Sequence, residues 1–255
     1  MITVGIDSGS TATKVAVVSG GRILAAVKAE TGTDPALTAS LCLDDALKSC
    51  GLSRKDVVSI VTTGYGRDLI PGRKKSVTEI TCHARGASQS VPGAKTVVDI
   101  GGQDSKIIRL DGAGLVLDFV MNDKCAAGTG RFLEVMAGRL GLDLKEFERE
   151  WKAAREASKI SSTCTVFAES EVVSLISQGV STSSVVRGLC DAIASRIASM
   201  GRRVGIERPV VLTGGVSLNG GVRRSLERVL GSEIVVPPMS VFMGAYGAAL
   251  IAASS

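Results

Sequence analysis

Short apolar strands that end in polar, glycine-containing turns recur along the chain. Residues 2–18, ITVGIDSGSTATKVAVV, predict an apolar strand, a turn rich in Gly, Ser and Thr, and a second β-branched strand. Residues 95–110, KTVVDIGGQDSKIIRL, repeat that order around the turn DIGGQDSK. A lysine follows each turn, Lys14 in the first segment and Lys106 in the second. The repetition predicts two β-hairpins and a chain built from two similar halves.

The remaining pattern predicts helices and further strands around these hairpins. Asp34 and Pro35 have the side chains of an N-cap and a first helical residue, so a helix is expected over 34–50. A strand at 57–61 precedes the glycine turn TTGYGR. Later helices are expected at about 129–140, 143–157, 165–178, 183–203 and 244–254, with a strand and double-glycine turn within 209–219, a helix to about 230 and a strand at 233–238.

Composition is typical of a tightly turned α/β protein. The 255 residues are 45% hydrophobic and 3% aromatic, and they include 30 glycines. The net charge of +5 comes without a basic run longer than GRKK at 72–75. Because stacking on aromatic side chains supports much of single-strand binding, we do not expect nucleic acid to be a partner.

Neither a membrane anchor nor a disulfide framework is expected. No stretch reaches the roughly 18 apolar residues of a membrane helix, and the opening MITVGIDSGS lacks the basic start of a signal peptide. We therefore expect a cytoplasmic protein. The six cysteines, at 42, 50, 82, 125, 164 and 190, show no CxxC spacing, so one chain alone offers no compact zinc or cluster motif.

The hairpin turns have the chemistry of a phosphate site. Glycines let backbone N–H groups approach phosphate oxygens, and the neighbouring hydroxyls add donors. Any one such turn is more often an ordinary hairpin, but four glycine turns at the ends of apolar strands favour a nucleotide site. The predicted nucleotide-binding residues are Gly9, Ser10, Thr11, Lys14, Gly101, Gly102, Gln103, Gly214, Gly215 and Asn219. For Lys14, a solvated strand lysine is an equally good interpretation.

Three polar side chains in these turns are candidates for catalysis. Asp7 and Asp104 suit Mg²⁺, which they would hold mostly through its waters. Gln103 is suited to orient an attacking water, as glutamine does in other nucleotide hydrolases. The only histidine, His83, lies beside Cys82 and is expected to be structural.

Several motifs together resemble a known superfamily. DSGSTATK, TTGYG, DIGGQD, LTGGV and the late GAYGA helix resemble the acetate kinase, sugar kinase, Hsp70 and actin ATPases. Within it, MNDKCAAGTGRFLEVMA and SSTCTVFAESEV resemble the activator of 2-hydroxyacyl-CoA dehydratases. The resemblance implies an α/β fold with two actin/Hsp70-like (ribonuclease H-like) halves and a nucleotide cleft between them. Residues 1–94 with 240–255 would form the first half, and 95–239 the second, which carries the cluster cysteines.

Members of that group are homodimers with one [4Fe-4S] cluster, and each subunit donates two cysteines. Carried onto this chain, the ligands are Cys125 and Cys164, and a twofold axis would double two thiolates into four. Without the resemblance, Cys125 would more often be a structural residue, or a thiol nucleophile. Each cysteine precedes an expected helix, and the second of these helices is expected to turn Phe167, Val173 and Ile176 inward.

The resemblance implies an ATP hydrolase that donates single electrons. Its cofactors would be the cluster, ATP or ADP, and Mg²⁺; ferredoxin or flavodoxin would supply electrons, and an iron-sulfur acceptor such as a 2-hydroxyacyl-CoA dehydratase would receive them. A double-cubane-cluster protein or a benzoyl-CoA-type reductase is the alternative acceptor. A small-molecule kinase of the same superfamily is a further alternative, though no sugar-binding signature is present. A third interpretation of the protein's function is a nucleotide-dependent assembly protein.

Overall fold

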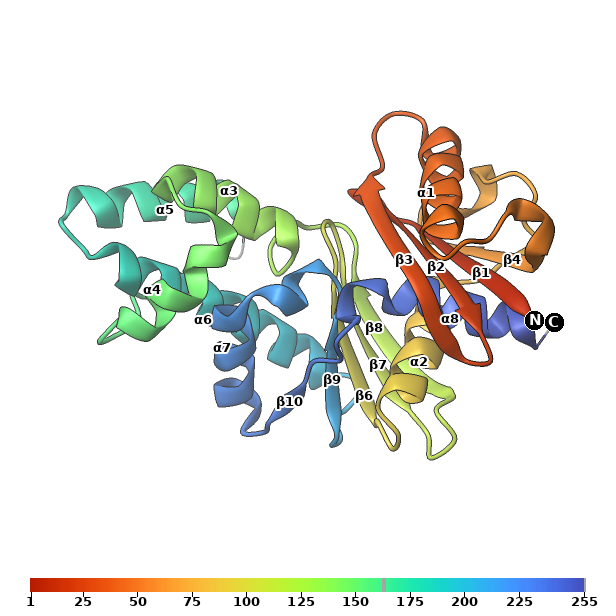
Figure 1. The fold of residues 1–255 in the computed structure, drawn as a ribbon. Coiled ribbons are helices and arrows are strands. Elements are labelled where there is room, and N and C mark those ends of the chain that lie inside the picture. Colours follow the sequence, from red (N-terminus) through yellow and green to blue (C-terminus); the bar gives the residue numbers. More distant parts are fainter. Residues whose placement is uncertain (162–163, 255) are drawn as a thin grey trace.

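Two five-stranded mixed sheets form the centre of the molecule (Figure 1). The computed structural model describes residues 1–161 and 164–254. The first sheet, in the order β3-β2-β1-β4-β5, contains β1 (Ile2–Ser8), β2 (Ala12–Ser19), β3 (Arg22–Glu30), β4 (Val57–Thr63) and β5 (Lys75–Ser76). The second, in the order β10-β9-β6-β7-β8, contains β6 (Thr96–Ile100), β7 (Ser105–Leu110), β8 (Val116–Asn122), β9 (Val210–Thr213) and β10 (Ile234–Val235).

The two sheets share one topology, as the repeated hairpins predict. In the first, β2 pairs antiparallel with β1 and with β3, while β4 runs parallel to β1. In the second, β7 pairs antiparallel with β6 and with β8, while β9 runs parallel to β6. The register repeats too, because Asp7 lies opposite Lys14 and Asp99 lies opposite Lys106. Asp99, rather than Asp104, is therefore the counterpart of Asp7.

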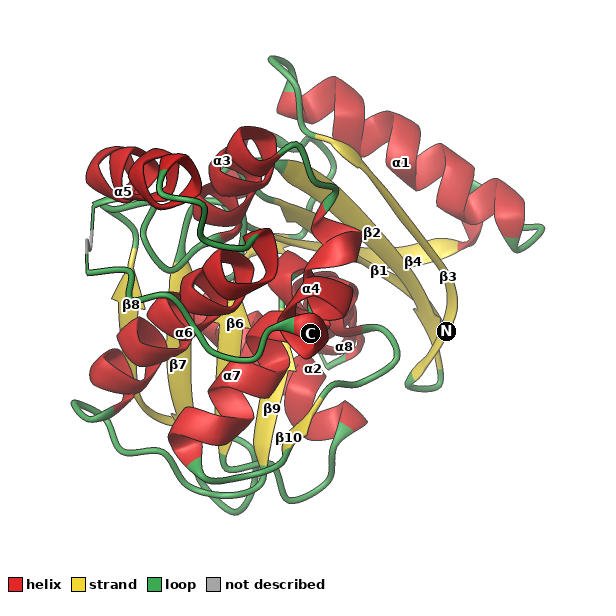
Figure 2. Ribbon diagram, turned by 90° about the vertical axis from the view of Figure 1, so that its left-hand side faces the viewer, coloured by secondary structure: helices red, strands yellow, loops and turns green. Residues whose placement is uncertain are grey.

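Helices cover both sheets (Figures 1 and 2). They are α1 (Pro35–Ser49), α2 (Glu79–Ser90), α3 (Gly130–Leu140), α4 (Phe147–Ala153), α5 (Thr165–Ser177), α6 (Thr182–Gly201), α7 (Gly220–Leu230) and α8 (Met243–Ala253). The predicted start of α1 is confirmed, since the Asp34 carboxylate accepts the Leu37 N–H at 2.9 Å. Within the described residues, no helix combines the length and apolarity needed to cross a bilayer.

The C-terminal helix α8 packs backbone to backbone against β1 and α2. A methyl group added at Gly5 of β1 would lie 1.8 Å from the Ala245 carbonyl oxygen. One added at Gly247 of α8 would lie 1.8 Å from the Cys82 carbonyl oxygen in α2. Because real side chains never approach so closely, these glycines are required for the three elements to meet.

The inward face predicted for α5 is wrong. Phe167, Val173 and Ile176 are 69%, 50% and 41% exposed, whereas Ala168 and Val172 are the buried residues of this helix. Ala168 and Val172 thus make the buried contact of α5, and Leu175 packs beside them, while Phe167, Val173 and Ile176 remain at the surface.

The hydrophobic pattern does not predict β3, α2 or β8. It also predicts two other elements that are longer than those observed. The expected helix over 143–157 is a 3₁₀ turn at Leu144–Glu146 followed by the short α4. The expected strand over 233–238 consists of β10 alone, because the two prolines after it have no N–H to donate to a neighbouring strand.

Candidate functional site

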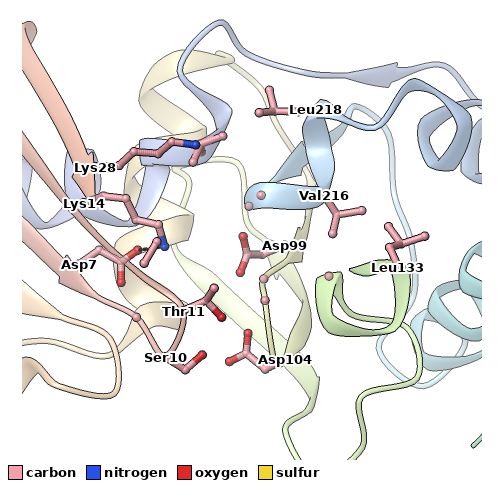
Figure 3. A pocket seen from close by; sticks show the side chains of 18 of the residues that line it. Asp7, Ser10, Thr11, Lys14, Lys28, Asp99, Asp104, Leu133, Val216 and Leu218 are labelled. Atoms are coloured by element: carbon pink, nitrogen blue, oxygen red, sulfur yellow. Dashed lines mark hydrogen bonds and ion pairs between the residues drawn. The ribbon is translucent and has the colours of Figure 1, made fainter. Parts of the chain in front are cut away.

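A cleft of about 430 Å³ opens between the two sheets, where the hairpin turns face each other (Figure 3). Ser10 and Thr11 belong to the β1–β2 turn, and Asp104 belongs to the β6–β7 turn on the other side. Of the predicted nucleotide-binding residues, those that line the cleft are Gly9, Ser10, Thr11, Lys14, Gly101, Gly102, Gly214, Gly215 and Asn219. Gln103 is exposed and does not line the cleft.

Glycines bring the backbone of the two turns close to each other and to the cleft. A methyl group at Gly102 would lie 2.3 Å from the Thr11 hydroxyl oxygen, so the turns of the two halves touch here. Gly214 has φ of +85°, and a methyl group there would lie 2.3 Å from the Ile100 carbonyl oxygen. Only glycine meets both conditions at this position. Backbone groups are therefore exposed to a ligand on both sides of the cleft, as phosphate binding requires.

Asp7 fits the role of a Mg²⁺ partner. Its Oδ2 accepts from the Lys14 ammonium at 3.2 Å. Its Oδ1 is buried and has no hydrogen-bond partner among the described residues. Burial alone would lower the pKa of Lys14, but the Asp7 carboxylate outweighs it and raises the pKa, so Lys14 stays charged. A buried carboxylate oxygen without a partner is a site for a hydrated cation.

Lys106, the second of the two lysines that follow the hairpin turns, is the centre of a buried group of charges. Its Nζ lies 2.7 Å from Asp104, 3.4 Å from Asp99 and 3.6 Å from Glu79. Burial would lower the pKa of Lys106, but the three carboxylates outweigh it and raise the pKa. Burial raises the pKa of Glu79 to about 7, against the opposing effect of Lys106. The Lys106 ammonium is therefore surrounded by three carboxyl groups at the floor of the cleft.

His83, which was expected to be structural, lines the cleft. Its Nδ1 lies 3.2 Å from Asp99 Oδ1, which accepts from the Thr213 hydroxyl at 2.8 Å. Burial lowers the pKa of His83, so the ring is neutral, and its Nδ1–H group donates to the Thr213 hydroxyl oxygen at 3.2 Å.

Some residues that line the cleft were not predicted from the sequence; they include Lys28, Tyr65, Glu79, Asp99 and Glu134. Asp99 could have been predicted from spacing. It precedes Lys106 by seven residues, just as Asp7 precedes Lys14 by seven residues.

The two predicted cluster ligands lie in loops that precede helices. Cys125 is half-buried between β8 and α3, and the Asn122 amide fixes its loop by donating to the Cys125 carbonyl oxygen at 2.8 Å. Cys164 is exposed and is the N-cap residue of α5. Over residues 1–161 and 164–254, no group of three or more His, Cys, Asp or Glu is arranged to hold a metal ion. One exposed and one half-buried thiol have the ligand chemistry of half a four-thiolate site.

The other cysteines have the surroundings of core residues. Cys42, Cys82 and Cys190 are buried, and Cys50 is half-buried. Burial raises the pKa of Cys82 to about 12 and also raises the pKa of Cys190. Such thiols stay protonated at neutral pH, which makes them poor metal ligands and poor nucleophiles.

The cleft is hydrogen-bonded directly to the helix that follows Cys125. Gly130 and Arg131, the first residues of α3, donate their N–H groups to the carbonyl oxygens of Gly101 and Gly102, both at 2.8 Å. At its far end, α3 is joined to α5 by an ion pair between Arg139 and Glu169. The β6–β7 turn, the start of α3 and helix α5 are thus connected by direct contacts.

The chain is similar to known proteins over almost its whole length. The model of the BadF/BadG/BcrA/BcrD ATPase family matches residues 4–252 of the chain. The activator of lactoyl-CoA dehydratase from Anaerotignum propionicum is 46% identical over 253 residues, which cover 99% of this chain and 97% of that protein.

Two solved structures are similar over nearly their whole length. Component A of the Acidaminococcus fermentans (R)-2-hydroxyglutaryl-CoA dehydratase has a TM-score of 0.96 at 42% identity, covering 100% of this chain and 98% of that chain. The activator of the 2-hydroxyisocaproyl-CoA dehydratase from Clostridium difficile, with bound ADPNP, has a TM-score of 0.94 at 43% identity, covering 99% and 94%. These similarities confirm the fold expected from the sequence.

Proposed function

Because the chain belongs to the BadF/BadG/BcrA/BcrD ATPase family, we propose that it is an ATP-dependent activator that reduces a 2-hydroxyacyl-CoA dehydratase. The observation that carries the proposal is the pair of hydrogen bonds from the start of α3 to the glycine turn of the cleft. They join the predicted nucleotide site to the loop of Cys125. An activator needs such a connection, whereas a simple kinase does not.

In this proposal, the two hairpin turns bind the phosphates through their glycine backbone and through Ser10 and Thr11. Asp7 and Asp104 hold the waters of Mg²⁺, and Gln103 orients the attacking water from its exposed position beside the cleft. Gly214 and Gly215 leave room for the nucleoside. Asn219 is buried, and its side-chain Nδ2 has no hydrogen-bond partner among the described residues, so a donor is available there.

Cys125 and Cys164 of two copies would hold one [4Fe-4S] cluster, which supplies one-electron transfer when bound. The surface beside Cys164 supports the dimer, because Val166 and Phe167 in the first turn of α5 are 67% and 69% exposed. A second copy would cover these apolar groups. The N–H groups at the start of α5 have no partners within the helix and would face the anionic centre.

Coupling follows from the contacts already described. Closure of the halves on ATP would press the Thr11 turn against Gly102, and the carbonyl groups of Gly101 and Gly102 would move α3. The ion pair between Arg139 and Glu169 would carry the movement to α5. Both cysteine loops would then shift on each turnover. We place the protein in the cytoplasm, where ferredoxin or flavodoxin would return it to the reduced state.

The decisive experiment is anaerobic purification of the Cys125→Ser and Cys164→Ser variants with iron and sulfide analysis. Both should bind ADP and stay folded but lose the cluster. Cys50→Ser, in a half-buried helix-end thiol, is the matched control and should retain it. Full iron in either variant would overturn the assignment.

The acceptor is then tested with the wild-type protein. ATP-dependent reduction of a purified 2-hydroxyacyl-CoA dehydratase is expected. If only a double-cubane protein or a benzoyl-CoA-type reductase is reduced, the acceptor is wrong; if none is reduced and a small molecule is phosphorylated, the protein is a kinase.

A further inference from the structure

A second cavity, of about 670 Å³, lies between the two cysteine loops. One side is formed by Ala127 and Gly128, two and three residues after Cys125, and the other by residues 157–161, which lead to Cys164. The floor is α6, whose Gly188 approaches so closely that a methyl group there would lie 2.2 Å from the Ser158 carbonyl oxygen. We call this cavity the loop groove.

The loop groove is cationic. Lys159, Arg196 and Arg203 line it, and none of them has an ion-pair partner in the described part of the chain. Arg196 Nε is buried and without a hydrogen-bond partner there, and the Arg196 side chain packs against Gly128, at 3.2 Å from a methyl group built on that glycine. Asp191 is the one acid among the lining residues described. Its carboxylate is already occupied by Arg228 and by the Ser225 hydroxyl, so it does not neutralise the groove.

The charge of the groove separates it from a self-association surface. If the groove met its own counterpart across a twofold axis, like charges would face each other, which costs free energy. The exposed apolar side chains of α5 are the better surface for that contact. An acidic partner, in contrast, would gain ion pairs with all three cations and would be steered toward the cysteine loops.

We propose that the loop groove is the docking surface for an electron carrier protein with an acidic surface, of the ferredoxin type. This inference rests on the proposed function, because it assigns an entry point for the electron. The carrier would give up one electron, which the cluster held by Cys125 and Cys164 would accept when bound, with no bond made or broken. Docking in the groove places the carrier against both loops that hold the cluster ligands.

The test compares two triple variants that lose the same charge. In the groove variant, Lys159, Arg196 and Arg203 are each replaced by Gln. In the control variant the replaced residues are Arg22, Lys48 and Lys55, which are exposed on the first half and have no ion-pair partner in the described residues. Affinity for an oxidised acidic ferredoxin is measured by calorimetry on iron-free and iron-loaded protein, at low and physiological ionic strength. The rate of reduction by reduced ferredoxin is measured by stopped flow.

At low salt, the groove variant should bind ferredoxin about tenfold more weakly and be reduced by it about tenfold more slowly. Both quantities should depend less on salt than in the wild type, as expected for electrostatically steered association. Reduced methyl viologen, a small cation, should reduce it as fast as wild type, and its ATPase rate should be unchanged. Arg196→Lys with Arg203→Lys should restore binding. If the groove variant kept the wild-type affinity and salt dependence, the loop groove would not be the docking surface. A wild-type protein that binds no iron would instead overturn the proposed function.

Discussion

Gly130 donates its backbone N–H to the Gly101 carbonyl oxygen at 2.8 Å, and this bond ties the start of α3 to the turn that lines the cleft. The next residue repeats the contact on Gly102. Helix N-termini have N–H groups without partners inside the helix; here two of them are satisfied by a predicted phosphate turn. The position of that turn therefore determines where α3 begins.

The first prediction concerns contact between the two turns. Gly102→Ala would place a methyl group 2.3 Å from the Thr11 oxygen and push the turns apart. ATP hydrolysis should fall by about 10²-fold, since small displacements of reacting groups have effects of that size. Steady-state ATPase assays check it. Gly138→Ala is the control, because a methyl group there meets nothing within 4 Å. Wild-type turnover in Gly102→Ala would show that the turns do not meet during the reaction.

The second prediction uses the equivalence of the two strand lysines. Lys106→Met leaves the carboxylates of Asp99, Asp104 and Glu79 together in a buried site, so the free energy of unfolding should drop by about 3 kcal/mol or more. Lys14→Met removes a cation that is 19% exposed and, among the described residues, forms an ion pair with Asp7 alone, so this change should cost less. Urea denaturation of the iron-free proteins compares them. Equal losses would mean that the buried cluster is not what distinguishes these positions.

The third prediction is a pH dependence of stability. The pKa of Glu79 is raised from 4.5 to about 7 in the folded chain. Below the unfolded value both states hold the proton; as the pH rises toward 7, the unfolded chain releases it first and the folded state loses stability. For one proton the slope is about 1 kcal/mol per pH unit. Relative to wild type, Glu79→Gln should become more stable as the pH rises from 5 to 7, measured by urea denaturation. Glu233→Gln, at an exposed carboxylate, should run parallel to wild type.

The fourth prediction concerns the exposed apolar face of α5. Phe167→Ser removes a side chain that is 69% exposed, so the monomer should keep its stability while the proposed dimer weakens. Sedimentation velocity of the anaerobic protein measures the change. Leu69→Ser, at a side chain 62% exposed on the first half, is the control and should leave association unchanged. Equal dimerisation of the two variants would place the interface elsewhere.

Sequence patterns predict those parts of this molecule in which local chemistry and burial agree. The hairpins are such parts, because a polar glycine turn between β-branched strands has few other structures. Helix α2 has no clear apolar stripe, since it packs through small residues such as Gly86 against the backbone of α8. Helix α5 fails for the opposite reason: its large apolar residues lie at the surface, where a pattern read for one chain expects polar groups.

Sequence patterns predicted only those site residues that belong to a local motif. Glycines, hydroxyls and Asp7 belong to motifs, so they could be assigned. His83 and Glu79 come from a helix that sequence patterning does not detect, and their roles depend on Asp99 and Lys106 across the fold. The pKa of Glu79 has the same origin, because burial between two sheets is a property of the assembled chain.

The close backbone contacts of α8 set an order on folding. Gly5 in β1 and Cys82 in α2 both meet residues of α8, and every strand of the second sheet lies between α2 and α8 in the sequence. Contacts between segments so far apart in the sequence form slowly, because a long loop must close first. The first sheet therefore cannot complete its packing as an independent N-terminal unit. The two sheets must fold together, and the cleft between them forms in the same process.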